Sequence, residues 1–220
     1  MLVWAMGLPA ADYLIGPVPP LWLTAARMVV AALVLLPVWL LLERPDLRPI
    51  PWRLATGVGA LLAAGAFLLV VAQAQTDAVT VAVVSAAMPV VGLGIEVLTD
   101  GRRLTLAMGM GVALSLFGGI LALGTGMGTG MGEAGLRLDL GLGALAALAS
   151  ITLYTLGSRW TVTALPGLTP LGRSTLTILG AALVTILAAT LATGLGAPGP
   201  DWAALGLREA VALLIYGVFA

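Results

Sequence analysis

Cysteine and histidine are both absent from this 220-residue sequence. Their absence excludes disulfide bonds, thiolate nucleophiles and imidazole general bases, and it removes nearly every ligand set for zinc, haem or iron–sulfur clusters. We therefore expect no metal site, no cofactor and no catalytic residue. These absences favour a protein that is not an enzyme.

Charged residues are also scarce, at 9% of the chain, and the formal net charge is zero. The ten basic residues are all arginine and form no basic tract. The sequence thus lacks the electrostatic pattern of a nucleic-acid-binding protein, and nucleic acid is excluded as a partner. The use of arginine in place of lysine throughout is typical of a GC-rich bacterial genome.

Hydrophobic residues, by contrast, make up 60% of the chain, which leaves too little polar surface to cover a water-soluble protein of this size. The hydrocarbon core of a bilayer is about 30 Å thick, and a helix needs roughly 20 apolar residues to cross it. A chain of this length has room for about eight such spans. The composition predicts an all-α, polytopic membrane helical bundle in contact with the lipid bilayer.

Apolar runs bounded by charges, proline and glycine predict where these spans lie. The N-terminus has no positively charged region followed by a small-residue cleavage site, so the first run is expected to stay in the protein. The first and last runs are short, and we expect residues to be missing at both ends. The runs comprise residues 1–15, 21–42, 54–73, 78–98, 104–123, 140–156, 169–195 and 205–220.

The arginines are distributed unevenly between the two sets of loops. Three lie on one side, and seven lie in or beside the loops after the second, fourth and sixth runs. Because cytoplasmic loops collect positive charge, this pattern predicts a multi-pass protein of the cell membrane, here a bacterial inner membrane, with a cytoplasmic N-terminus. The seven are Arg44, Arg48, Arg53, Arg102, Arg103, Arg159 and Arg173.

A glycine-rich stretch follows the fifth run and is too flexible in composition to hold a helix. We interpret it as a joint between two parts of the chain. The predicted organisation is therefore a first five-helix repeat at residues 1–124, a linker at 125–138 and a second, incomplete repeat at 139–220.

The two parts are weakly similar in sequence. Tyr154 aligns with Trp4, and Trp202 aligns with Trp52. A repeat of five spans is odd-numbered, so its second copy enters the membrane upside down, as in many secondary transporters with a substrate site between the repeats. Chance alignment of two alanine-rich apolar segments explains the same similarity, and the residues leave both explanations open.

Small residues recur at every fourth position in the fifth and seventh runs. Such stripes let helix backbones approach closely, so packing is their expected role. The threonines of the seventh run are an exception, because hydroxyl groups facing a cavity can serve a polar ligand. The stripes are Ala107, Gly111, Ser115 and Gly119 in the fifth run, and Thr177, Ala181, Thr185, Ala189 and Thr193 in the seventh.

Residues 76–123 carry the most recognisable pattern. A Thr/Ala-rich helix start leads to a mid-helix proline at Pro89, then to a short turn at residues 101–105 and a glycine-rich helix. Earlier, an aromatic residue lies in the first run at Trp4, and Arg27 follows a pair of prolines. This order and spacing resemble the EamA-type family of the drug/metabolite transporter superfamily.

The resemblance implies ten helices in two inverted five-helix repeats, and transport of small metabolites or drugs, often as export. This chain holds about eight of the ten, so by the resemblance it is truncated before the last two helices. Arg102 occupies the turn position where the family usually has glutamate. We read this reversal of charge as the mark of a divergent subfamily, and it weakens any transfer of a substrate.

Polar side chains within the spans are the first candidates for substrate binding. Arg27 lies inside the second run, where it could attract an anionic group in a cavity or extend to the outer headgroups. Gln73 closes the third run, and Thr80 and Ser85 open the fourth. These three could line an outward-facing mouth, or they could form hydrogen bonds between helices.

Four further residues complete the candidate site. Pro89 removes a backbone hydrogen bond in mid-span and can free a carbonyl group beside a cavity. Trp4 and Tyr154, at matching points of the two parts, could stack on a substrate or be ordinary aromatic residues of the bundle. Thr177 is the first hydroxyl of the seventh-run stripe.

The leading hypothesis is a secondary transporter or exporter that moves small metabolites or drugs by alternating access. A small-molecule solute is then the expected partner, and a homodimer is a further candidate. The alternatives are a non-functional fragment or obligate assembly partner, and an intramembrane enzyme. The enzyme is less favoured, because no histidine can pair with a serine nucleophile and no two carboxylates share a helix face within the membrane.

Overall fold

The computed structural model describes residues 2–44, 50–76, 78–101, 103, 105–124, 142–201 and 205–219. The predicted linker at 125–138 and Arg102 lie outside them. Within the described residues the chain forms nine α-helices. These are α1 (Leu2–Leu14), α2 (Pro20–Glu43), α3 (Trp52–Gln75), α4 (Ala78–Ser85), α5 (Met88–Asp100), α6 (Leu106–Gly124), α7 (Leu142–Ala164), α8 (Pro170–Gly194) and α9 (Leu207–Phe219).

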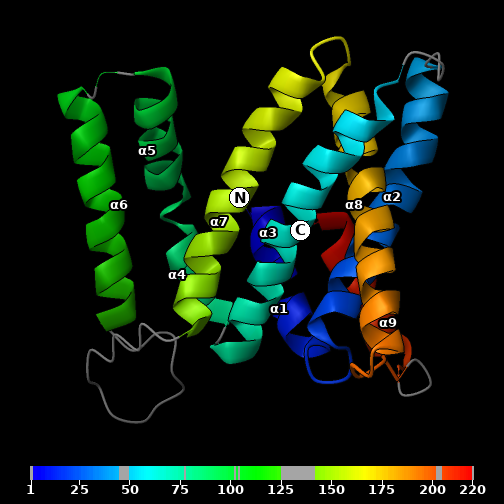
Figure 1. Ribbon diagram of the computed structural model, residues 1–220. Helices are drawn as coiled ribbons and strands as arrows, with labels where there is room; N and C mark the ends of the chain where they lie inside the picture. Colours follow the sequence, from blue (N-terminus) through cyan, green and yellow to red (C-terminus); the bar gives the residue numbers. More distant parts are fainter. Residues whose placement is uncertain are drawn as a thin grey trace.

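The helices run roughly side by side, and the connections between them lie at two opposite ends of a bundle (Figure 1). The central helix α3 packs against α7 and α8, and α8 also packs against α2. The helices α4, α5 and α6 form an outer group that meets the rest of the bundle mainly through α7. The predicted all-α membrane bundle is thus confirmed.

Contacts in the main part of the bundle occur in corresponding pairs. The helix α1 packs against α9, and α7 packs against α3. In the same way α2 packs against α9, and α8 packs against α3. The remaining large contact joins α2 to α8. These two helices occupy equivalent places if α1, α2 and α3 form one set and α7, α8 and α9 the other.

Two predicted helix limits differ from the structure. The fourth run, expected as one span at 78–98, is divided into α4 and α5 at Pro89. The sixth run was expected to end at residue 156, but α7 continues to Ala164. Arg159 does not interrupt α7, because arginine is a good helix former, and its guanidinium forms a salt bridge of 2.6 Å with Asp100 at the end of α5.

Glycines allow three helix backbones to touch near the centre of the bundle. A Cβ atom added at Gly59 of α3 would lie 2.6 Å from the Ala181 nitrogen of α8, and one at Gly180 would lie 2.7 Å from the Thr56 Cα. A Cβ atom at Gly65 would meet the α7 backbone at 3.1 Å. The packing of α3 on α7 and α8 therefore depends on glycines, which have no side chain to keep the backbones apart.

The two small-residue stripes have different surroundings. In α8, Ala181, Thr185 and Ala189 are buried, as expected for packing. In α6, Ala107 and Gly111 are exposed. The packing predicted for the α6 stripe is therefore not found at these two positions, because α6 lies at the edge of the bundle with few neighbours among the described residues.

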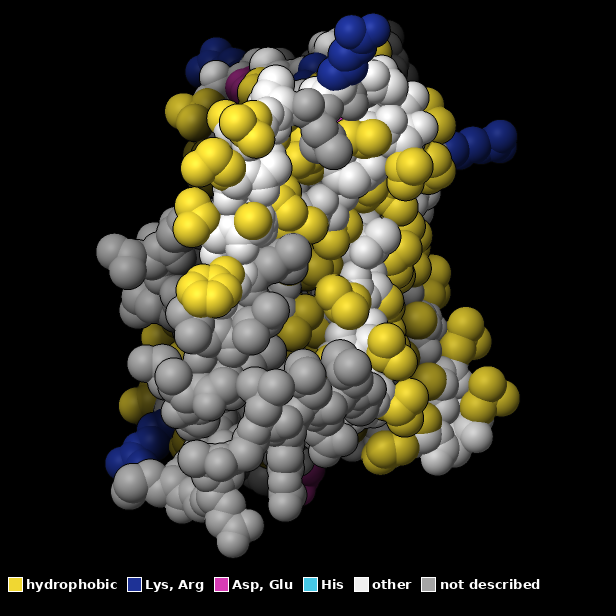
Figure 2. Space-filling view, turned by 90° about the vertical axis from the view of Figure 1, so that its left-hand side faces the viewer, with side chains coloured by type: hydrophobic (Ala, Val, Ile, Leu, Met, Phe, Trp, Pro, Cys, Tyr) yellow, Lys and Arg dark blue, Asp and Glu magenta, His cyan; other side chains and the backbone are white. Residues whose placement is uncertain are grey.

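The outer surface is apolar, as expected for a protein surrounded by lipid. Hydrophobic side chains cover most of the visible described surface between the two ends, and most of the visible arginines lie toward one end (Figure 2). Leu41, Leu98 and Leu106 are each more than 70% exposed. Among the described residues, α2, α3, α8 and the combined stretch Thr80–Asp100 are long and apolar enough to cross a membrane.

Candidate functional site

The break between α4 and α5 follows from the sequence around Pro89. Proline has no N–H group, so the carbonyl of Ser85 cannot receive its usual i+4 hydrogen bond, and the proline ring would clash with that carbonyl in a continuous helix. Ala86 and Ala87 form a turn after Ser85, and α5 begins at Met88 with Pro89 in its first turn. The kink predicted at Pro89 is present.

A small cavity lies beside this break. Its volume is about 30 Å³. At 1.5 Å per residue, Arg27 lies roughly 10 Å from the start of α2, which places the cavity well inside a hydrocarbon core of about 30 Å. Side chains from five helices, α2, α3, α4, α5 and α7, line it: Arg27, Ala66, Leu69, Ser85, Met88, Ser150, Ile151 and Tyr154.

Arg27 supplies the positive charge of the cavity. Its side chain is buried, with a relative exposure of 7%. The guanidinium carbon lies 4.9 Å from the centre of the Tyr216 ring of α9, within the range of a cation–π contact. The Nη1 atom also donates to the Tyr216 hydroxyl, at a long distance of 3.5 Å. Among the residues that the structure describes, no aspartate or glutamate lines the cavity.

Three hydroxyl-bearing residues accompany the arginine. The Ser85 Oγ atom is buried and has no hydrogen-bond partner within the described chain. The Ser150 hydroxyl donates to the Gly65 carbonyl at 2.7 Å, so its oxygen keeps capacity only as an acceptor. Tyr154 is 41% exposed and lies where α7 approaches α3. The cavity thus combines one cation, one hydroxyl without a partner and an apolar wall.

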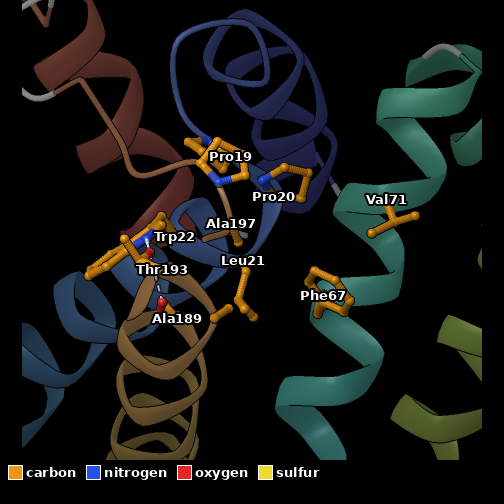
Figure 3. Close-up of a pocket in the computed structure, with 11 residues that line it drawn as sticks. Pro19, Pro20, Leu21, Trp22, Phe67, Val71, Ala189, Thr193 and Ala197 are labelled. Carbon is orange, nitrogen blue, oxygen red and sulfur yellow. Dashed lines mark hydrogen bonds between the residues drawn. The ribbon is translucent and has the colours of Figure 1, made fainter. Parts of the chain in front are cut away.

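A second pocket, of about 220 Å³, lies between the start of α2, the last turns of α3 and the end of α8 (Figure 3). Pro19 and Pro20 lie at one side, and Phe67 faces them from α3. Trp22 donates from its indole nitrogen to the Thr193 hydroxyl at 2.9 Å. No ionisable side chain lines this pocket, so it offers a solute shape without charge recognition. We place the candidate site in the smaller cavity, where the charged and hydroxyl groups converge.

The structure brings together Arg27, Ser85 and Tyr154 from the predicted set, with Pro89 beside them at the break. Gln73 lies outside the cavity and donates from Nε2 to the Leu8 carbonyl at 3.0 Å, which ties α3 to α1. Its position corresponds to the hydrogen bonding between helices that was one of its two predicted roles.

Among the remaining predicted residues, Thr177 and Thr80 line neither pocket. The Thr177 hydroxyl donates to the Arg173 carbonyl of its own helix at 2.8 Å, and its side chain is buried where α8 meets α3. Thr80 lies in α4, one end of the broken span. Trp4 lies in α1, and its side chain is outside the described residues.

Sequence reasoning missed Ser150 and Tyr216. Ser150 is a polar residue in the middle of an apolar run, and that contrast was an available clue. Tyr216 offered none, because an aromatic residue in the last run has no distinguishing pattern. Only the contact of α9 with α2 brings its ring to Arg27.

The comparisons with known proteins identify the family. The model of the EamA-like transporter family matches residues 1–124, which is more than half of the chain. The chain belongs to the EamA-like transporter family. The resemblance read from residues 76–123 is thus confirmed. Comparison with curated proteins gave no match.

A solved crystal structure supports the fold of this EamA-like protein. The similarity has a TM-score of 0.64 at 22% sequence identity, and it covers 99% of this chain and 73% of the other. At that identity the likeness concerns the fold alone. The EamA-like chain is therefore a multi-pass membrane protein of a transporter family that moves small solutes.

Proposed function

We propose that this EamA-like protein is a secondary transporter that exports small metabolites or drugs across the cytoplasmic membrane by alternating access. The observation that carries the proposal is the cavity at the α4–α5 break, which five helices line and which gathers polar side chains from α2, α4 and α7 inside the membrane. Irregular backbone at membrane depth is tolerated where it lines a cavity, and it is a recurring feature of transporter substrate sites.

The size of the cavity supports a mechanism with moving helices. About 30 Å³ holds a water molecule but no organic solute, since sites for such solutes measure roughly 300 Å³ or more. A solute therefore binds only when helices separate. Two hydrogen bonds join α2 to α8 near the two ends of the bundle. Trp22 donates to Thr193 at one end, and the Thr169 hydroxyl donates to Glu43 over 2.6 Å at the other.

The helix contacts support inverted repeats as the parts that move. A constant shift of 150 residues relates the end of α1 at Leu14 to that of α7 at Ala164, and Pro20 at the start of α2 to Pro170 at the start of α8. Under the same shift α3 corresponds to α9, which accounts for the paired contacts of α1 with α9 and α7 with α3. We infer a first repeat at 1–124 and a second at 139–220, joined by the linker at 125–138.

The distribution of arginine supports a cytoplasmic N-terminus. Arg44, Arg53, Arg159 and Arg173 all lie at or near helix ends on the side of the bundle where α2 and α7 end. If this side faces the cytoplasm, as the positive charge favours, α1 begins toward the cytoplasm. The 220 Å³ pocket then opens near the outer face.

Transport is tested with three probes that share one ring and differ in charge: 4-hydroxyphenylacetate, 4-hydroxyphenylacetamide and tyramine. Each labelled probe is offered to proteoliposomes that contain the purified chain, and protein-free vesicles give the leak. We expect uptake of at least one probe to saturate, and preloading with the unlabelled probe to accelerate it, as carriers require. Uptake that is linear in concentration for all three, at the protein-free rate, would contradict the proposal.

A further inference from the structure

The guanidinium of Arg27 lacks a carboxylate partner. Among the described residues its contacts are the ring and the hydroxyl of Tyr216, both uncharged. An arginine side chain keeps its charge in proteins, and a buried charge without a counterion is costly in a membrane. An anion in the adjoining cavity removes that cost.

The geometry of the arginine leaves N–H donors for an anionic ligand that enters when the helices separate. The Tyr216 ring covers one face of the guanidinium, and the long 3.5 Å contact engages one nitrogen. Guanidinium carries five N–H donors in a planar fork that matches the two oxygens of a carboxylate. Since Arg27 lines the cavity, the donors not used by Tyr216 are available to a carboxylate there.

Ser85 provides a second, independent observation. Its Oγ atom is 94% buried, by a relative exposure of 6%, and has no hydrogen-bond partner in the described chain. A buried hydroxyl without a partner is rare in stable structures. It lines the same cavity as Arg27, so a carboxylate oxygen bound to Arg27 offers Ser85 the acceptor that it lacks.

The rest of the cavity wall fits an apolar body. Leu69, Met88 and Ile151 supply hydrophobic contacts, and Tyr154 adds an aromatic ring. We propose that the solute is a small organic acid whose carboxylate binds Arg27 and Ser85 while its apolar part faces α3 and α7. This inference rests on the proposed transport function and assigns its substrate class.

The other role considered for Arg27, extension to the outer headgroups, fits the structure less well. Such extension keeps the charged end in water or at the lipid surface. The relative exposure of Arg27 is instead only 7%, and its guanidinium lies over the ring of Tyr216, which is itself 1% exposed. The charge is held inside the bundle.

The test compares binding of 4-hydroxyphenylacetate with that of its neutral amide. Binding is measured in detergent as a concentration-dependent rise in melting temperature, and transport as half-saturation of flux. We expect the acid to stabilise the wild-type protein and the amide to have at least tenfold weaker effect. Arg27→Gln should weaken acid binding by about tenfold or more, because it removes a charge-assisted bond, while Arg27→Lys should retain part of it.

Controls separate this inference from general effects of charge. Arg208→Gln removes an exposed arginine outside both pockets and should bind the acid as the wild type does. If Arg27→Gln does not fold, Ser85→Ala removes one hydroxyl and should weaken acid binding about three- to tenfold. Saturable flux with no preference for the acid, or a preference unchanged by the Arg27 and Ser85 substitutions, would overturn the inference and leave transport standing. Absence of saturable flux for all three probes would count against transport itself.

Discussion

At the scale of single residues, glycines determine how closely the helices of this protein pack. Gly59 and Gly180 let α3 and α8 touch along their backbones, and Gly65 does the same for α3 and α7. The last of these contacts also positions Ser150, whose hydroxyl donates to the Gly65 carbonyl. The close approach of α3 and α7 at Gly65 thus sets one wall of the cavity, since Ser150 lines it.

Substitution of Gly59 tests this close packing, with Gly57 as a matched control on the same helix. Gly59→Ala should lower the free energy of unfolding by about 1–3 kcal/mol, because the new methyl group meets the α8 backbone. Gly57→Ala meets nothing within 4 Å and should raise stability by up to about 1 kcal/mol through helix propensity. Unfolding in detergent measures both. Equal effects of the two substitutions would contradict the packing described.

At the scale of helices, the divided span of α4 and α5 is the element most closely tied to function. One proline divides an otherwise apolar run into two helices, which are separated by a turn at Ala86 and Ala87. The same break leaves the Ser85 hydroxyl buried beside Arg27 and Tyr154. A continuous helix would present a different face to the cavity.

Pro89→Ala should rejoin α4 and α5 by restoring the hydrogen bond to the Ser85 carbonyl. We expect the melting temperature to stay the same or rise, because the rejoined helix gains a backbone hydrogen bond. Flux should fall about tenfold, since the cavity loses its irregular wall. Pro37→Ala is the control, because Pro37 lies inside the unbroken helix α2. Loss of flux in both variants, or in neither, would argue against a special role for the break.

At the scale of the whole molecule, charge and contacts divide the bundle in different ways. Arginines such as Arg53, Arg159 and Arg173 lie near one end, the end that we propose to be cytoplasmic. The paired contacts divide it instead into two sets of helices, α1–α3 and α7–α9, which meet where α3 packs on α7 and α8, where α2 packs on α8, and where α9 packs on α1 and α2. The candidate cavity lies between these sets, with contributions from α2 and α3 on one side and α7 on the other.

The orientation can be tested with single cysteines, since the chain has none of its own. Gly16 follows α1 and Gly167 precedes α8, at opposite ends of the bundle, and both are exposed with open space around them. A membrane-impermeant maleimide should label Gly16→Cys in intact cells, and Gly167→Cys only after permeabilisation. The reverse pattern would place the N-terminus outside the cytoplasm.

Only part of the candidate site could be predicted from the sequence. Arg27, Ser85 and Pro89 stood out because charges, hydroxyls and prolines are rare inside apolar spans, and rarity can be read directly from a sequence. Thr177 matched the same criterion, yet its hydroxyl bonds to its own helix. The sequence cannot distinguish a hydroxyl that bonds to its own helix from one that faces a cavity, because it does not show how each helix is rotated about its axis.

The amino-acid sequence alone determined the membrane environment, the helical class, the places of most spans and the family, because each depends on local composition, periodicity or motif order. Only the tertiary structure decided that Tyr216 covers Arg27 and that Ser150 lies against Gly65. It also decided that Ala107 and Gly111 of the α6 stripe are exposed while Ala181, Thr185 and Ala189 of the α8 stripe are buried. These outcomes depend on which helix faces meet, and residues separated by up to 189 positions in the chain set that choice through packing, which no local pattern encodes.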